Sequence, residues 1–185
     1  MDLGFRMHAE RTPNPDSIKW VLGLELAPPG VGAHFDERPA VDVSPLAAAL
    51  FDIDGVTGVF LTSNFVTVTK GEAQDWTGIA EPIVTAIKGC LGAGASALGP
   101  DFVPRKCISE SSVELRICDI LDEEIRPAVA RDGGDIVFVG FRAGIVELYM
   151  QGSCAGCPSS TVTLKNGIEA RLREAIPEVL GVAAV

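Results

Sequence analysis

Long apolar runs and basic clusters are both missing from this sequence of 185 residues. No apolar stretch approaches the roughly 20 residues that a membrane-spanning helix requires. The formal net charge is −10, the acidic excess extends over both halves, and no local basic patch could attract a nucleic-acid backbone. The first residues also lack the charged-then-apolar order of a signal peptide. We therefore expect a cytoplasmic protein that binds neither membranes nor nucleic acid.

Cysteine is scarce, and its number is odd. The chain has five cysteines, and an odd count without a secretory signal argues against a framework of disulfides. In a reducing compartment, two cysteines that are close in sequence indicate a metal site or a redox site. Cys154 and Cys157 form such a pair, whereas Cys90, Cys107 and Cys118 are spread along the chain.

The first half shows alternating helix and strand patterns. Ser44-Pro45 has the composition of a helix start, with a Ser cap and Pro in the first helical position. Alternating apolar residues indicate strands, and isoleucines four residues apart indicate an amphipathic helix. The predicted elements are a strand over 18–26, a helix over 46–53, a hairpin of strands over 56–62 and 65–70, and a helix over 76–91.

The second half begins after a stretch rich in Gly and Pro, which predicts a linker over 96–109. The predicted fold class is α+β, with two small domains over 1–95 and 110–185. The elements predicted for the second domain are a helix over 111–131 that is kinked at Pro127, strands over 135–140 and 145–151, a helix to about 175, and a short strand from 179. Ala128 should end the buried stripe of the first helix, and Val162 should lie on the inner side of the last helix with Ile168, Leu172 and Ile176.

The sequence around Cys154 and Cys157 predicts reactive sulfur. Two intervening residues let both sulfurs point toward one small inorganic core, and Gly152 and Gly156 allow backbone angles that are closed to other residues. Pro158 fits the first turn of the following helix, whose N-terminal partial positive charge should lower the thiol pKa. The pair should also be accessible to a second copy of the chain. Thiolates attack disulfides and also bind metals, so this pattern alone does not choose between the two uses.

The number of ligands favours a metal site that two chains share. Structural zinc and iron–sulfur clusters are usually held by about four protein ligands, and the Cys154–Cys157 loop contains no His, Asp or Glu to complete such a set. Cys90 and Cys118 lie on predicted helices as small buried residues, and Cys107 lies near the linker. Two chains related by a two-fold axis would bring four thiolates to one point.

Several longer segments of the second half match a known family. They are Arg126-Pro127, Asp132-Gly133-Gly134-Asp135, the run from Gly152 to Ser160, and the helix residues from Thr163 to Glu169. On these segments, residues 110–185 resemble the C-terminal domain of the Nfu/NifU family of iron–sulfur scaffold and carrier proteins. The first half resembles the N-terminal domain of many Nfu proteins through Arg11-Thr12-Pro13-Asn14-Pro15 and Ile18-Lys19-Trp20.

The resemblance implies a carrier and not an enzyme. It implies assembly of a labile [4Fe-4S] cluster, or a [2Fe-2S] cluster, that is bridged between two subunits and delivered to client apoproteins. Cys154 and Cys157 match the cluster ligands, so that the cluster-bound form should be a homodimer that also meets upstream cluster donors. The N-terminal domain resembles a partner-recognition module, and no catalytic residue is expected.

Two alternatives use the same pair of cysteines. A thioredoxin-like dithiol redox protein also places a CxxC motif between a strand and a helix, but here a helix and a hairpin precede the motif. A structural zinc site in an interaction module would also suit tetrahedral sulfur.

Overall fold

The computed structural model describes residues 5–104, 111–155 and 158–185, the last range with side chains from residue 162 onward. The chain divides into two compact units, Met1–Pro104 and Arg105–Val185. Each unit has its own sheet, helices and apolar core, so the predicted α+β class with two domains is confirmed. Within the described residues, no helix combines the length and the apolar character needed to cross a membrane.

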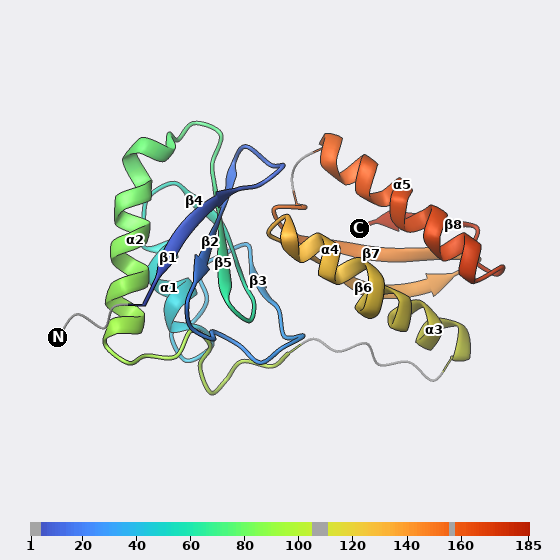
Figure 1. Ribbon diagram of the computed structural model, residues 1–185, viewed down its shortest axis with the longest axis horizontal. Helices are drawn as coiled ribbons and strands as arrows, with labels where there is room; N and C mark the ends of the chain where they lie inside the picture. Colours follow the sequence, from blue (N-terminus) through green and yellow to red (C-terminus); the bar gives the residue numbers. More distant parts are fainter. Residues whose placement is uncertain (1–4, 105–110, 156–157) are drawn as a thin grey trace. The chain divides into compact units, whose positions relative to one another are not determined.

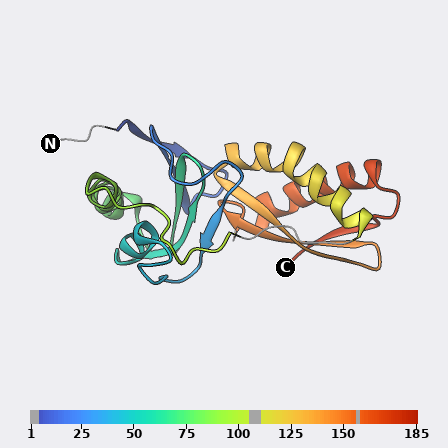
Figure 2. The same cartoon turned by 90° about the horizontal axis from the view of Figure 1, so that it is seen from below.

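The first unit is an antiparallel sheet of five strands in the order β1-β2-β5-β4-β3, with its two helices on one face (Figure 2). Its core lies between that face and the helices. The elements are β1 (Met7–Arg11), β2 (Ser17–Leu22), β3 (Ala33–Phe35), α1 (Pro45–Phe51), β4 (Val56–Leu61), β5 (Phe65–Lys70) and α2 (Trp76–Gly92) (Figure 1).

The predicted helix starts and the hairpin of this unit are confirmed. The Ser44 side chain accepts a hydrogen bond from the backbone N–H of Ala47 at 3.1 Å, and Pro45 follows as the first residue of α1. Strands β4 and β5 pair antiparallel as predicted. The edge strands β1 and β3 were not predicted, because β1 is largely polar and exposed and β3 has only three residues.

The predicted linker is partly folded onto the first unit. Ala97 is buried in the first core, and the Ser44 hydroxyl donates a hydrogen bond to its carbonyl oxygen at 2.7 Å. The backbone N–H of Gly99 donates to the carbonyl of Val43 at 2.9 Å. These contacts attach the chain after α2 to the residues before α1.

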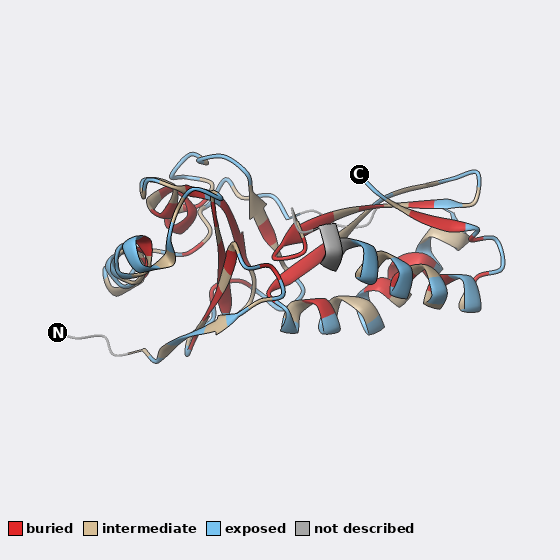
Figure 3. Ribbon diagram, turned by 90° about the horizontal axis from the view of Figure 1, so that it is seen from above, coloured by how far each residue is buried: buried red, intermediate tan, exposed pale blue. Residues whose placement is uncertain are grey.

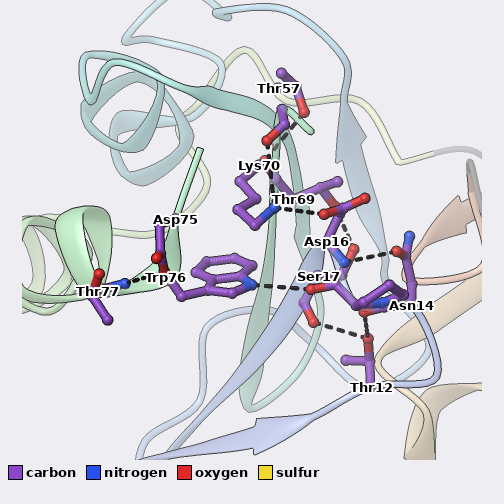
Figure 4. Close-up of polar contacts among 12 residues, drawn as sticks. Thr12, Asn14, Asp16, Ser17, Thr57, Thr69, Lys70, Asp75, Trp76 and Thr77 are labelled. Atoms are coloured by element: carbon purple, nitrogen blue, oxygen red, sulfur yellow. Dashed lines mark hydrogen bonds and ion pairs between the residues drawn. The ribbon is translucent and has the colours of Figure 1, made fainter. Parts of the chain in front are cut away.

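The turn between β1 and β2 is fixed by a polar network (Figure 4). The Asn14 side chain accepts a hydrogen bond from the backbone N–H of Asp16 at 3.0 Å, which closes an Asx turn. Lys70 at the end of β5 forms an ion pair with Asp16 at 2.5 Å. The indole N–H of Trp76, the first residue of α2, donates to the carbonyl of Pro15 at 3.0 Å. The Thr-Pro-Asn-Pro motif therefore joins one end of the sheet to the start of α2.

The second unit is a sheet of three strands in the order β6-β7-β8, with its long helices on one face (Figure 2). Strands β6 and β7 are antiparallel, and β8 runs parallel to β7. In Figure 3, buried residues mark the faces of the helices and strands that meet in this core. The elements are α3 (Ser112–Ile120), the π-helical turn η1 (Leu121–Ile125), α4 (Arg126–Arg131), β6 (Gly134–Arg142), β7 (Ile145–Gly152), α5 (Pro158–Ala175) and β8 (Gly181–Ala184).

The helix predicted over 111–131 contains a π-helical turn in place of a simple kink. The backbone N–H of Arg126 bonds to the carbonyl of Leu121, five residues earlier, and the following Pro127 has no N–H to donate. One additional residue in this turn rotates the buried face beyond it. Val129 is therefore buried at 2% exposure, and the prediction that Ala128 ends the buried stripe is wrong.

Three of the four residues predicted for the inner side of the last helix are buried, two of them in α5 and Ile176 directly after it. Ile168, Leu172 and Ile176 are fully buried, as predicted, but Val162 is 56% exposed. Val162 is six positions before Ile168. At 3.6 residues per turn, this spacing places the Val162 side chain about 120° around the helix axis from that of Ile168. The prediction for Val162 is therefore wrong.

Candidate functional site

Cys154 lies in the turn that follows β7, where the chain folds back over the start of β6. Strand β7 ends at Gly152 with a positive φ of 61°, which favours glycine. Gly152 is the register partner of Gly134, the first residue of β6. The backbone N–H of Ser153 then donates to the carbonyl of Gly133 at 3.2 Å. The turn is thus attached to the chain segment just before β6.

The sulfur of Cys154 rests against Gly134. A Cβ atom built on Gly134 would overlap this sulfur, and it would also lie 2.8 Å from the carbonyl oxygen of Gln151. The backbone N–H of Cys154 donates to that same carbonyl at 3.3 Å. The side chain and the backbone of Cys154 are therefore both packed onto residues of the hairpin.

Burial decides the protonation of Cys154 in the metal-free chain. The residue is 6% exposed, and this burial raises the pKa of its thiol from 9.0 to about 11. The hydrogen bond with Ser153 lowers this pKa, whereas the carboxylates of Asp132 and Asp135 raise it. The expectations of an accessible sulfur and of a lowered thiol pKa are therefore wrong for Cys154, because desolvation outweighs the other influences.

An ion pair stands beside the turn. Arg126 forms a bidentate contact with Asp135, with distances of 2.8 Å from Nε to Oδ1 and 2.6 Å from Nη2 to Oδ2. Arg126 also donates to Asp122, four residues earlier in the sequence, at 2.9 Å. Asp135 accepts the backbone N–H of Ile136 at 2.8 Å as well, and its side chain is 8% exposed. The ion pair connects α4 to the start of β6.

These contacts explain the motif residues 132–135, which the sequence indicated only as part of the family resemblance. Gly133 has a positive φ of 81°, and the Ser153 hydroxyl donates to the carbonyl of Asp132. Gly134 accommodates the sulfur, and Asp135 holds Arg126. The motif forms one side of the Cys154 site, and its adjacent glycines were the only signal for this in the sequence.

The other predicted thiols are placed as follows. Cys157 and Cys107 lie outside the described residues. Cys90 is a half-buried free thiol on α2, and burial raises its pKa. Cys118 is buried but disulfide-bonded, which corrects its interpretation as a simple small buried residue. Within the described residues, no three His, Cys, Asp or Glu side chains are grouped so that they could hold a metal ion.

Comparisons with known proteins match both units. The NifU-like domain matches residues 117–183, and the N-terminal domain of the scaffold protein Nfu/NifU matches residues 7–94. A protein of Drosophila erecta named "NFU1 iron-sulfur cluster scaffold homolog, mitochondrial" is 40% identical over 182 residues, which are 97% of this chain and 64% of the relative. A protein of Drosophila sechellia with the same name is 39% identical over the same shares of both chains.

Solved structures are also similar to this chain. One of them is the solution structure of a NifU-like protein from Saccharomyces cerevisiae, with 17% sequence identity and a TM-score of 0.48. The match covers 55% of this chain and 92% of the yeast chain.

The protein therefore consists of two α+β units. The second unit holds the Cys154 thiol in a turn that packs against a two-glycine motif. The chain belongs to the Nfu/NifU family, with an Nfu-type N-terminal domain followed by a NifU-like domain. It spans about 64% of the length of the Drosophila erecta relative. The word "mitochondrial" in the names of these relatives contradicts the predicted cytoplasmic location, which is withdrawn.

Proposed function

We propose that this chain is a scaffold and carrier for a labile iron–sulfur cluster, which two copies hold through Cys154 and Cys157 and pass to apoproteins. The observation that carries the proposal is the placement of Cys154. Its backbone is tied to the hairpin, and its sulfur lies against a glycine that leaves space for it. A sulfur held in this way is prepared to act as a ligand and needs little rearrangement of the backbone.

The number of ligands supports a cluster that two copies share. Each chain supplies two thiols that are three positions apart in the sequence, and iron–sulfur clusters are commonly held by four thiolates. A homodimer would complete the set at a two-fold axis. We propose [4Fe-4S] as the cluster, with [2Fe-2S] as the alternative of the same ligand count.

The raised thiol pKa argues against the dithiol redox alternative. Reactive thiols in redox proteins have a lowered pKa, because the thiolate is the attacking form. Burial instead raises the pKa of Cys154 to about 11, so this thiol is protonated at neutral pH. A metal ligand must lose its proton on binding, so that protons compete with iron for the sulfur. Such competition supports weak, reversible binding, which suits a carrier.

Delivery then needs only ligand exchange, and the chain catalyses no reaction of its own. A client thiolate forms a bond to a cluster iron, and the bond from that iron to the Cys154 sulfur breaks. The released thiolate takes up a proton from water. We propose that the first domain, residues 1–95, recognises the client apoproteins or the upstream donors.

Anaerobic reconstitution with ferrous iron and sulfide tests this function. We expect broad visible absorption and about four irons per two chains, since four thiolates hold one [4Fe-4S] cluster. Cys154→Ser and Cys157→Ser should each abolish the absorption. The control is Cys90→Ser, which changes a half-buried free thiol in the other unit and should leave the cluster unchanged. Full cluster content in both motif variants would overturn the proposal.

A further inference from the structure

Gly134 has a role that its backbone does not explain. Its φ lies outside the left-handed region that favours glycine, in contrast to the neighbouring Gly133 with a φ of 81°. Gly134 starts a regular strand and pairs in register with Gly152. Glycine inside a strand is unfavourable in general and often marks a close approach of another group. The reason for glycine at 134 therefore lies in what contacts it.

A Cβ atom at 134 would meet the sulfur of Cys154 first and the carbonyl oxygen of Gln151 next, at 2.8 Å. It would overlap this sulfur, and it would lie 3.1 Å from the backbone nitrogen of Cys154. By contrast, a Cβ atom on Gly140 of the same strand would meet only the Glu147 carboxylate, at 3.6 Å. The space above Gly134 is thus occupied by the proposed ligand atom, whereas Gly140 has room for a methyl group.

Hydrogen bonds hold the backbone of the turn on both sides of Cys154. The N–H of Cys154 is bonded to the Gln151 carbonyl at 3.3 Å, and the N–H of Ala155 is bonded to the Gly152 carbonyl at 3.1 Å. These bonds fix the backbone on each side of the Cα atom of Cys154. A methyl group at 134 would therefore turn the thiol to another rotamer or lift the turn from the hairpin.

We infer that Gly134 is a positioning residue, whose missing side chain forms the seat that holds the Cys154 sulfur in the orientation needed for metal binding. This inference rests on the proposed function for the identity of the cargo. The seat itself is a property of the metal-free chain, and it can be tested without a cluster.

The first test is a double-mutant cycle in the metal-free full chain. Gly134→Ala is made in the wild type and in Cys154→Ala, and Gly140→Ala is the matched control. The unfolding equilibrium constant of the second unit is measured by hydrogen exchange of the β6 and β7 amides. We expect Gly134→Ala to raise this constant in both backgrounds. The fold increase in Cys154→Ala should be at least about threefold smaller than the fold increase in the wild type. Gly140→Ala should raise it equally in both backgrounds.

Equal effects of Gly134→Ala in the two backgrounds would overturn the inference. If Gly134→Ala does not fold but the double variant does, the inference is supported. If neither folds, the inference is also overturned, because the turn backbone and not the sulfur then excludes a side chain.

The second test measures the thiol and the cargo directly. Iodoacetamide should alkylate Cys154 of metal-free Gly134→Ala at least about tenfold faster than in the wild type, since a displaced thiol regains solvent and its thiolate fraction rises. The rate at Cys90 is the internal reference. In reconstituted protein, Gly134→Ala should shift the visible absorption or lower the iron content, and Gly140→Ala should not.

Unchanged alkylation of Cys154 in Gly134→Ala would contradict the seat. If the wild type binds no cluster but the coupling and the alkylation change as expected, the proposed function fails and the seat stands. If the wild type binds a cluster and Gly134→Ala shows neither coupling nor altered alkylation, the seat fails and the proposed function stands.

Discussion

Removal of the Arg126 guanidinium should destabilise the second unit strongly. The Asp135 side chain is 8% exposed and that of Arg126 is 27% exposed, so Arg126→Gln leaves a largely buried carboxylate that has lost its cationic partner and still accepts the Ile136 N–H. Breaking a buried ion pair by removing one partner costs about 3–5 kcal/mol. Because Arg126 is partly exposed, we expect a loss of about 2–4 kcal/mol in the free energy of unfolding.

Two further variants distinguish the contribution of the Arg126–Asp135 ion pair to stability from the contributions of neighbouring contacts. Asp122→Asn removes only the contact of Arg126 with a side chain that is 59% exposed, and it should cost less than about 1 kcal/mol. Asp135→Asn, added to Arg126→Gln, removes the unpaired charge and keeps an acceptor for the Ile136 N–H. It should restore at least about half of the loss, since the uncompensated charge is then gone.

Hydrogen exchange of the β6 and β7 amides is the assay, because it reports on the second unit alone. Both tryptophans of the chain, Trp20 and Trp76, lie in the first unit, so their fluorescence follows that unit in the same samples. A loss below about 1 kcal/mol for Arg126→Gln, or an equal loss for Asp122→Asn, would refute the reasoning.

Three further predictions concern other features of the structure. Ala143 has a φ of 49° in the two-residue turn Ala143-Gly144, and Asn tolerates a positive φ better than Ala does. Ala143→Asn should therefore raise the free energy of unfolding in urea by about 0.5–1 kcal/mol, and a decrease would contradict the assigned turn. The indole N–H of Trp20 is buried and has no hydrogen-bond partner among the residues that the structure describes, so Trp20→Phe should cost less than about 1.5 kcal/mol in thermal unfolding, against about 3–5 kcal/mol for Trp20→Ala. The folded-state pKa of Cys154 is raised from 9.0 to about 11, so that its contribution to stability is complete below pH 9.0 and is lost as the pH rises toward 11. Over that window the free energy of unfolding of the wild type, measured relative to Cys154→Ala, should fall by about 2–3 kcal/mol, and a constant difference would contradict the burial of the thiol.

Much of the fold follows from local patterns that the sequence displays. The isoleucines at 79, 83 and 87 are buried along α2, as their spacing predicts. Ser44 caps α1 through its side chain, which its position before Pro45 predicts. Such features depend on residues that are close in the chain, and therefore the sequence reveals them.

Features that depend on tertiary contacts were not predictable. Pro127 requires a disturbance in its helix, but a kink and a π-helical turn satisfy that requirement equally, and only the turn moves Val129 into the core. The parallel pairing of β8 with β7 joins strands that α5 separates, so no local pattern shows it.

The sequence indicated candidate thiols but not the environment of Cys154. The spacing of Cys154 and Cys157 indicated the thiols, and the charge at a helix N-terminus indicated a lowered pKa. Burial of Cys154 arises where the turn after β7 meets Gly134, 20 residues earlier, and desolvation then raises the pKa to about 11. The space that Gly134 provides is visible only when the two segments are brought together.

The cluster shared between two copies is the central claim, and native mass spectrometry of anaerobically reconstituted full chain tests it most directly. We expect a species whose mass is that of two chains plus one [4Fe-4S] cluster, and only metal-free single chains for Cys154→Ser. A species of one chain that carries a whole cluster, or a two-chain cluster species that persists in Cys154→Ser, would contradict it.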